Sequence, residues 1–178
     1  MRFVKYIVFL LLVPMVTYGQ TVHIDSNRIV YKGTVKLDHV KKDELYARAK
    51  NAISRNVEGN RETIITHSGD KGMISANGSI KLASPYYMIN IVEYVLELSF
   101  EDGNYKYRID SVSIKQGERG GKINRISSEE LLKGMDQSGT VSANTEKQLN
   151  EIDMNFQKLL ALVCADMNRT SGVKNSYK

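Results

Sequence analysis

Residues 92–110 read VEYVLELSFEDGNYKYRID, and this stretch decides the fold. Apolar side chains occupy alternate positions from Val92 to Phe100, as in a strand with one buried face. Asp102-Gly103 tolerates the positive φ of a tight turn, so a hairpin connection is expected there. The alternation resumes at positions 105–109. The stretch therefore predicts a long antiparallel β-hairpin.

The alternation changes phase after Asp110, because the next apolar residues, Val112 and Ile114, take the other parity. A β-bulge or a sheet edge would explain this change. Residues 117–143 are rich in Gly, Ser and charge, and we predict a mobile connection there. Within it, residues 127–132 have the composition of a capped helix start.

The segments around the hairpin predict two helices and three further strands. Residues 28–37 alternate as a strand, in which Gly33 indicates a bulge or a close neighbour. Residues 41–57 have helical periodicity, whereas residues 63–66 and 73–82 are typical of short strands. The last helix has an apolar stripe about five turns long, made of Leu149, Ile152, Phe156, Leu159, Leu160, Val163 and Met167.

The element order predicts a single α+β domain over residues 28–169. Consecutive strands joined by short turns favour an antiparallel sheet, and each helix has one apolar face to bury. We therefore expect two layers, with both helices packed on one face of the sheet and the other face open to water. Residues 20–27 are expected to be flexible, and residues 170–178 form a polar tail.

The N-terminus has the three-part pattern of a secretory signal peptide. Arg2 and Lys5 precede an apolar run over residues 7–13, and small residues allow cleavage between Gly19 and Gln20. The run is shorter than the ~20 residues of a membrane-spanning helix. We expect cleavage, no further membrane span, and an extracytoplasmic location: periplasm, outer-membrane surface or medium.

The charge and cysteine content exclude some classes of function. The formal net charge is +5, and it falls to +3 when the two basic residues of the signal peptide are lost. A single cysteine excludes an internal disulfide and a zinc site built on several cysteines. On the open face, basic and acidic side chains are expected to alternate, which argues against a nucleic-acid partner. The basic side chains are Lys32, Lys36, Lys106 and Arg108, and the acidic ones are Glu93, Glu97 and Asp110.

The sequence also resembles a known family over residues 29–114. The segments that carry the resemblance are residues 29–31, the helix start at 43–49 (DELYARA), the strand at 92–100 and the hairpin at 102–109. Together they are similar to the secreted bacterial domain of unknown function 4468, described as having a TBP-like fold. The resemblance implies the order β-α-β4-α and transfers no catalytic residues. Members often have a Trp at the position of Ala52.

The sequence contains no recognisable catalytic or metal site. His23, His39 and His67 lie in separate segments, although His67 and Asp70 share a turn. Cys164 lies beside the apolar stripe of the last helix, as expected of a small core residue.

The one pair of acidic side chains on a single strand face is Glu93 with Glu97. They should lie about 13 Å apart, too far for a catalytic dyad. We therefore expect no catalytic residues, metal or cofactor.

Three hypotheses of function remain open. The first is a secreted, non-catalytic module that binds an envelope protein or a small ligand through its open sheet face or the 116–143 segment. The second is a small extracytoplasmic hydrolase whose site assembles only in three dimensions. The third is an envelope scaffold that oligomerises through a sheet edge.

Overall fold

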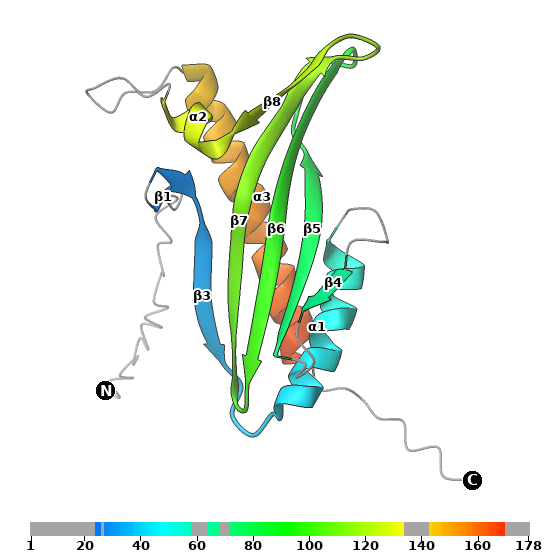
Figure 1. The fold of residues 1–178 in the computed structure, drawn as a ribbon, viewed down its shortest axis with the longest axis vertical. Helices are drawn as coiled ribbons and strands as arrows, with labels where there is room; N and C mark the ends of the chain where they lie inside the picture. Colours follow the sequence, from blue (N-terminus) through cyan, green and yellow to red (C-terminus); the bar gives the residue numbers. More distant parts are fainter. Residues whose placement is uncertain (1–23, 26, 58–63, 68–71, 134–142, 170–178) are drawn as a thin grey trace, which may run out of the picture.

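The computed structural model describes residues 24–25, 27–57, 64–67, 72–133 and 143–169 (Figure 1). Its strands are β1 (Ile24–Asp25), β2 (Arg28–Ile29), β3 (Tyr31–Lys36), β4 (Ile64–His67), β5 (Met73–Lys81), β6 (Met88–Glu101), β7 (Asn104–Glu118) and β8 (Ile123–Ser127). Its helices are α1 (Lys42–Asn56), α2 (Ser128–Lys133) and α3 (Ala143–Asn168).

The sheet is antiparallel and is built around the predicted hairpin of β6 and β7. Its strand order is β3-β7-β6-β5-β4, and β8 also pairs with β7. β7 is long enough to serve two partners on one edge, since residues 104–109 pair with β3 and residues 113–117 pair with β8. β1 and β2 form a separate two-stranded ribbon.

The phase change after Asp110 is a β-bulge. Val95 pairs with Asp110 and Glu93 pairs with Ser113, so Tyr94 faces two residues of β7. Ser111 takes the positive φ of 53° that this extra residue requires. Between the hairpin turn and the bulge, odd-numbered residues of β7 face the helices. Beyond the bulge, from Val112 onward, even-numbered residues face them. Of the two explanations that the sequence left open, a bulge or a sheet edge, the structure shows the bulge.

Two glycines in the sheet make room for tyrosine rings on the neighbouring strands. Gly33 pairs with Tyr107, and a Cβ at Gly33 would lie 2.4 Å from the tyrosine hydroxyl oxygen. Gly78 pairs with Tyr94, and a Cβ there would lie 2.3 Å from the ring. The close neighbour expected for Gly33 is therefore the Tyr107 ring.

Both long helices cover the same face of the sheet, as Figure 1 shows, which confirms the predicted two-layer α+β class. Phe156 of α3 lies at the centre of the interface and is fully buried. Its ring packs edge-on against Tyr31 and Tyr94, at centroid distances of 5.2 and 5.1 Å. The Tyr31 hydroxyl donates to the buried carboxylate of Asp153 (2.7 Å), and Gln157 donates to the other oxygen of that carboxylate.

Arg48 joins α1 to the C-terminal end of α3. Its guanidinium is buried and donates to the carbonyl oxygen of Met167 at 2.8 Å and to the Glu44 carboxylate. A cation near the last carbonyls of a helix interacts favourably with the helix dipole. Leu45 and Ala49 belong to the same 43–49 segment and are fully buried. This segment therefore contributes to the core between the helices and the sheet.

The hairpin turn also stabilises the start of α1. The Asp102 carboxylate accepts a hydrogen bond from the backbone N–H of Lys42 at 2.9 Å and pairs with the Lys41 ammonium at 3.0 Å. Both contacts hold the pKa of Asp102 below its ordinary value. Lys41, the residue before the helix, makes no capping hydrogen bond with its side chain. Asp102, in the turn of the β6–β7 hairpin, supplies the capping group instead.

The structure differs from the predicted mobile connection over residues 117–143. β7 continues to Glu118, β8 follows at 123–127, and the expected short helix is α2. The Ser127 hydroxyl caps that helix by accepting from the N–H of Glu130 at 3.2 Å. Gly120 and Gly121 lie in the turn between β7 and β8, and charged residues are compatible with β8 because this edge strand has largely exposed side chains. Residues 134–142 lie outside the described part of the chain.

The ends of the chain are described only in part. Residues 24–25, expected to be flexible, pair with β2. The predicted signal peptide with its Gly19–Gln20 cleavage site and the polar tail at 170–178 lie outside the described residues. No helix in the described part has both the length and the apolar character needed to cross a membrane.

Candidate binding pocket

On the helix-facing side of the β6–β7 hairpin, the side chains are apolar near the bulge and become amides further from the hairpin turn. Along β6, Val92 is the last fully buried apolar residue on this face, and Asn90 takes the next position. Along β7, Ile114 is followed by Gln116. Asn90 and Gln116 are direct cross-strand partners, so the core ends at a pair of amides.

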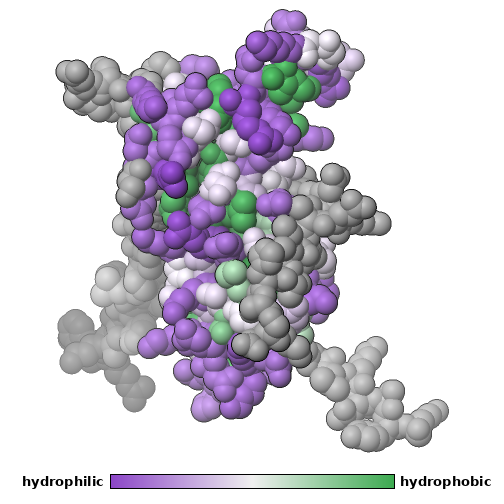
Figure 2. Space-filling view, viewed as in Figure 1, coloured by the Kyte–Doolittle hydropathy of each residue, from purple (hydrophilic) through white to green (hydrophobic). Residues whose placement is uncertain are grey.

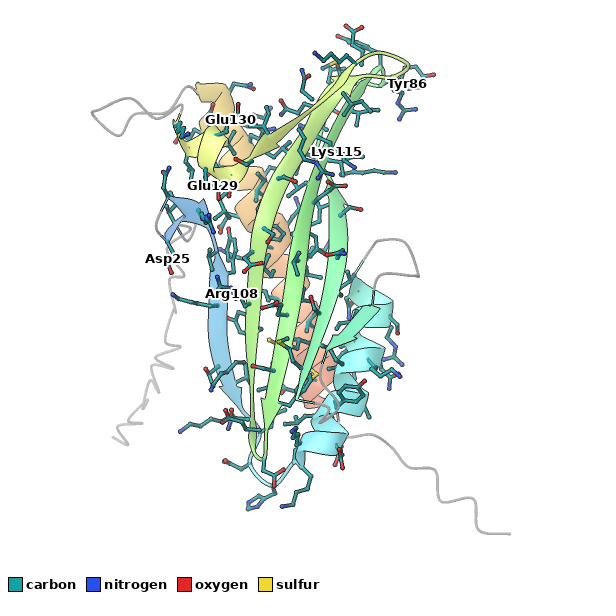
Figure 3. All side chains as sticks on the ribbon, viewed as in Figure 1. Asp25, Tyr86, Arg108, Lys115, Glu129 and Glu130 are labelled. Atoms are coloured by element: carbon teal, nitrogen blue, oxygen red, sulfur yellow. The ribbon has the colours of Figure 1, made fainter. Side chains whose placement is uncertain are left out.

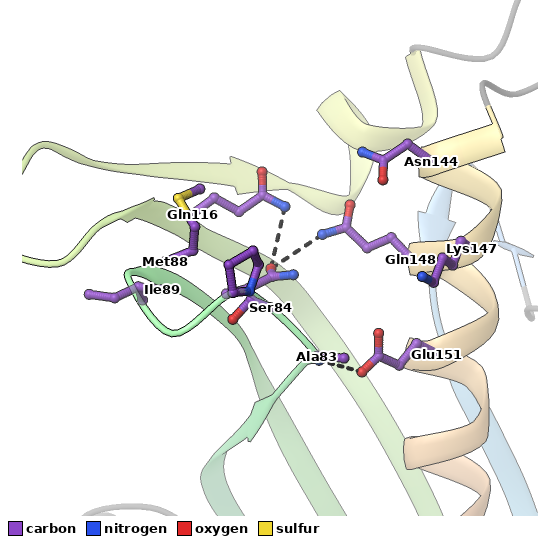
Figure 4. A pocket seen from close by; sticks show the side chains of 11 residues that line it. Ala83, Ser84, Met88, Ile89, Gln116, Asn144, Lys147, Gln148 and Glu151 are labelled. Carbon is purple, nitrogen blue, oxygen red and sulfur yellow. Dashed lines mark hydrogen bonds between the residues drawn. The ribbon is translucent and has the colours of Figure 1, made fainter.

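At this level the sheet bends away from α3 (Figure 1), and we call the diverging part, residues 83–91 and 115–127, the arm. A pocket of about 260 Å³ lies between the arm and the first turns of α3 (Figure 4). Four polar side chains of α3 with spacing i, i+3, i+4 and i+7 form one wall: Asn144, Lys147, Gln148 and Glu151. The β5–β6 connection and the start of β6 form the opposite wall, with Pro85 and Met88 as its apolar side chains.

Three amides meet in the pocket around one oxygen. The Oδ1 atom of Asn90 accepts from Nε2 of Gln116 and from Nε2 of Gln148, each at 3.3 Å. All three side chains are half-buried. The cluster connects both strands of the arm to α3, and its shape is fixed by hydrogen bonds among side chains that carry no charge.

Two backbone contacts hold the β5–β6 connection against this cluster. The N–H of Ala83 donates to the Glu151 carboxylate at 2.6 Å, and the N–H of Leu82 donates to the carbonyl oxygen of Asn90 at 2.9 Å. The rim of the pocket is thereby attached to both α3 and β6, which indicates a preformed site.

The pocket is equipped for hydrogen bonding. Carboxamides both donate and accept, but they do not titrate and are not nucleophiles. Lys147 and Glu151 are the ionisable side chains of the lining, and one Glu151 oxygen is engaged by Ala83. The arrangement can orient a polar ligand through several hydrogen bonds without a change in charge.

The open face of the sheet carries the expected mixture of charges (Figures 2 and 3). Figure 2 shows hydrophilic residues over most of this face, with small hydrophobic areas between them. Glu93 pairs with Lys115 and Arg125, both at 2.5 Å, and Asp110 pairs with Arg108 at 2.6 Å.

Further pairs join Lys106 to Glu101 at 3.1 Å and Lys32 to Asp25 at 2.7 Å. Asp110 raises the pKa of the Arg108 guanidinium. Because these charges neutralise one another locally, the face does not present a stripe of one sign.

The residues considered for chemistry in the sequence do not come together. Cys164 is partly buried against the core and lies close to the hydroxyls of Tyr105 and Tyr107. His39 lies in an exposed turn with a φ of 69°, and His67 lies in β4. His23 and Asp70 lie outside the described residues. Among those described, no three His, Cys, Asp or Glu side chains gather closely enough to hold a metal ion.

The pocket residues were not singled out from the sequence. One signal was available, since Asn90 and Gln116 interrupt runs of apolar residues on the buried face. Their pairing depends on the bulge, however, because without the extra residue Lys115 would face Asn90. The polar spacing on α3 is also typical of an ordinary solvated helix face.

Comparison with known proteins identifies the domain. Residues 31–115 match the family model described as a domain of unknown function (DUF4468) with TBP-like fold. This segment is therefore similar to the DUF4468 domain. This confirms the resemblance seen in the sequence, and no curated protein matches the chain.

Two solved structures have a similar fold. One is a TBP-like protein from Parabacteroides distasonis, with a TM-score of 0.68 at 12% identity over 84% of this chain and 98% of that one. Another is a DUF4468 family protein from Bacteroides ovatus, with a TM-score of 0.65 at 13% identity over 87% of this chain and 94% of that one. At such identities the likeness concerns the fold alone. The structural matches extend well beyond residues 31–115, so the likeness of fold includes most of this chain.

Proposed function

We propose that this protein is a secreted, non-catalytic module of the bacterial cell envelope that binds a small polar ligand in the pocket between the arm and α3. The observation that supports this proposal is the amide cluster of Asn90, Gln116 and Gln148. Polar groups at this depth are costly unless they are hydrogen-bonded. A site that keeps three of them at the end of an apolar core is better suited to recognition than to packing.

The chemistry of the lining favours binding over hydrolysis. General acid–base catalysis needs a titratable group within reach of the reacting atoms, and nucleophilic catalysis needs an activated nucleophile. Amides supply neither, and Glu151 is partly occupied by the Ala83 N–H. The single cysteine lies on α3 in the core, at the level of Tyr105 rather than in the pocket lining.

Export is the first part of the proposal to test. The gene would be expressed in a bacterial host with its own N-terminus, and the protein recovered from each cell fraction and the medium. We expect a product outside the cytoplasm whose intact mass corresponds to a chain starting at Gln20. A cytoplasmic product that retains residues 1–19 would contradict secretion.

Binding is the second part. The ¹⁵N-labelled protein would be titrated with small neutral, anionic and dipeptide compounds while the side-chain NH₂ signals of Asn90, Gln116 and Gln148 are followed. We expect at least one compound to move these three signals and to remain chemically unchanged after prolonged incubation.

The matched variants are Gln148→Met, which removes one amide from the pocket, and Asn150→Met, which removes an exposed amide from the same helix. Only Gln148→Met should weaken the response. Conversion of a compound would instead support the hydrolase hypothesis, and a panel that leaves all three signals unmoved would overturn binding at this pocket.

A further inference from the structure

We propose that the ligand of this pocket is one neutral sugar residue, an inference that rests on the proposed binding function. The argument begins with the hydrogen-bonding capacity that the amide cluster leaves open. Two bonds from Gln116 and Gln148 saturate the two lone pairs of Asn90 Oδ1. The NH₂ group of Asn90 and the second N–H of each glutamine remain to donate, and the carboxamide oxygens of both glutamines remain to accept.

This set of donors and acceptors matches hydroxyl groups. A sugar hydroxyl donates one hydrogen bond and accepts others from the same oxygen. Neighbouring hydroxyls on a ring can therefore meet both donors and acceptors on one side of the ligand. A carboxylate or phosphate only accepts, so it would leave the two glutamine oxygens without partners, at the cost of burying unsatisfied groups.

The charge of the lining points in the same direction. The pocket has one cationic side chain, Lys147, and one anionic side chain, Glu151, so its formal charge is zero. An excess of positive charge would favour an anion by raising its local concentration, and this lining has no such excess. Lys147 can donate to a hydroxyl, and the Glu151 oxygen not bound to Ala83 can accept from one.

The size and the apolar wall fit a single ring. The pocket volume of about 260 Å³ lies just below the usual range of ligand sites, ~300 to 1,000 Å³, and leaves room for one ring rather than a longer ligand. Pro85 and Met88 supply an apolar edge beside the amides, against which the C–H face of a sugar can pack, and Figure 4 shows Met88 next to Gln116. A peptide is a weaker match, because the donor and acceptor of a peptide group point in opposite directions.

The test compares ligand classes on the purified protein by the same NMR signals. The neutral probes are glucose, galactose, mannose and N-acetylglucosamine; the anionic probe is glucuronate, and the peptide probe is Ala-Ala. We expect at least one neutral sugar to move the NH₂ signals of Asn90, Gln116 and Gln148 in a saturable manner. Glucuronate and Ala-Ala should bind at least ~10-fold more weakly, the factor associated with one lost hydrogen bond.

Variants show whether the amide cluster is responsible. Asn90→Leu should weaken binding of the responding sugar by roughly tenfold or more, and Gln148→Met should do the same from the helix side. Asn150→Met should stay within about twofold of the natural protein, and circular dichroism would establish that each variant is folded. Equal affinity in Gln148→Met and Asn150→Met would overturn the assignment even if Asn90→Leu fails to fold.

The outcomes separate this inference from the proposed function. If glucuronate or Ala-Ala moves the pocket signals and no neutral sugar does, the pocket binds ligands and the sugar assignment is wrong. If no probe of any class moves them, the sugar assignment is wrong and the binding function is contradicted as well.

Discussion

The β6–β7 hairpin passes through two regions whose helix-facing side chains differ in kind. In the body of the sheet, between the hairpin turn and the bulge, helix-facing positions such as Leu96 and Ile109 are fully buried under α1 and α3. In the arm, the same strands present Asn90 and Gln116 to the same side. The body lowers the free energy of the fold by burying apolar surface, whereas the arm keeps polar groups satisfied around a cavity. Stability and recognition are therefore expected to separate along one hairpin.

The largest effect on stability is expected from Phe156→Ala, at the centre of the body. This change removes two edge-to-face ring contacts and leaves a cavity between α3 and the sheet. The free energy of unfolding should fall by about 3–5 kcal/mol, measured by urea denaturation. Met154→Ala on the same helix is the control, because that side chain is 61% exposed and its loss should cost at most ~0.5 kcal/mol. Equal losses would contradict the assignment of the core to this face of α3.

Alkaline pH should destabilise the body through its buried tyrosines. Burial, together with the Asp153 carboxylate, raises the pKa of Tyr31, and burial with the nearby Cys164 thiol raises that of Tyr105. The folded state therefore keeps these protons while the unfolded chain releases them above pH ~10. Stability is fully present below that pH and falls above it, by up to ~1.4 kcal/mol per pH unit for each tyrosine.

The free energy of unfolding should thus be roughly 3 kcal/mol lower at pH 11 than at pH 8 if both groups contribute fully. Urea titrations at several pH values would measure this slope. Tyr31→Phe serves as the control, since it removes one ionising group and should reduce the slope by about half. An unchanged slope in that variant would contradict the role of Tyr31.

The arm can be disturbed without the body by Gly117→Ala. A Cβ at this position would lie 2.4 Å from the carbonyl oxygen of Lys122, a backbone atom that cannot move away cheaply. The change should cost about 1–2 kcal/mol, a typical overpacking penalty. Because β8 can separate from β7 without opening the core, we expect the loss as faster amide exchange in residues 123–127, with little change in α3. Gly121→Ala is the control in the same hairpin, where the nearest atom is a side-chain carbon at 3.3 Å.

The body could be predicted from the sequence because its signals are local and periodic. The alternation from Val92 to Phe100, the Asp102-Gly103 turn and the stripe around Phe156 each specify an element and its buried face. The edge strand β8 could not be predicted, since its side chains are largely exposed and it is stabilised by pairing with β7.

The pocket could not be predicted because it depends on distant residues. Gln148 reaches Asn90 across 58 positions of sequence, and no spacing rule connects them. The polar face of α3 becomes one wall of a cavity only because the sheet bends away from it at that height (Figure 1). Composition also misleads in this region, because the Gly and charge that indicated a mobile connection belong partly to an ordered hairpin of β7 and β8.

An effect on stability as small as that of Gly117→Ala is expected at Ser111, the residue that separates the body from the arm. A β-branched side chain is poorly tolerated at its φ of 53°, so Ser111→Val should cost about 1–2 kcal/mol, measured by urea denaturation. Ser111→Gly should remain within about 0.5 kcal/mol of the natural protein, because glycine adopts this conformation freely. Ser113→Val, two residues along the same strand, is the control.

The bulge at Ser111 sets the position of the pocket. The extra residue shifts the pairing of β7 by one, so that Gln116 meets Asn90 under α3 while Lys115 meets Glu93 on the open face. Without it, the pairing of Val95 with Asp110 would continue upward and place Lys115 opposite Asn90. Ser111→Val should therefore disturb the NH₂ signals of Asn90 and Gln116 more than those of amides in the body. If it alters them equally, the bulge does not separate the two regions and the contrast between body and arm is wrong.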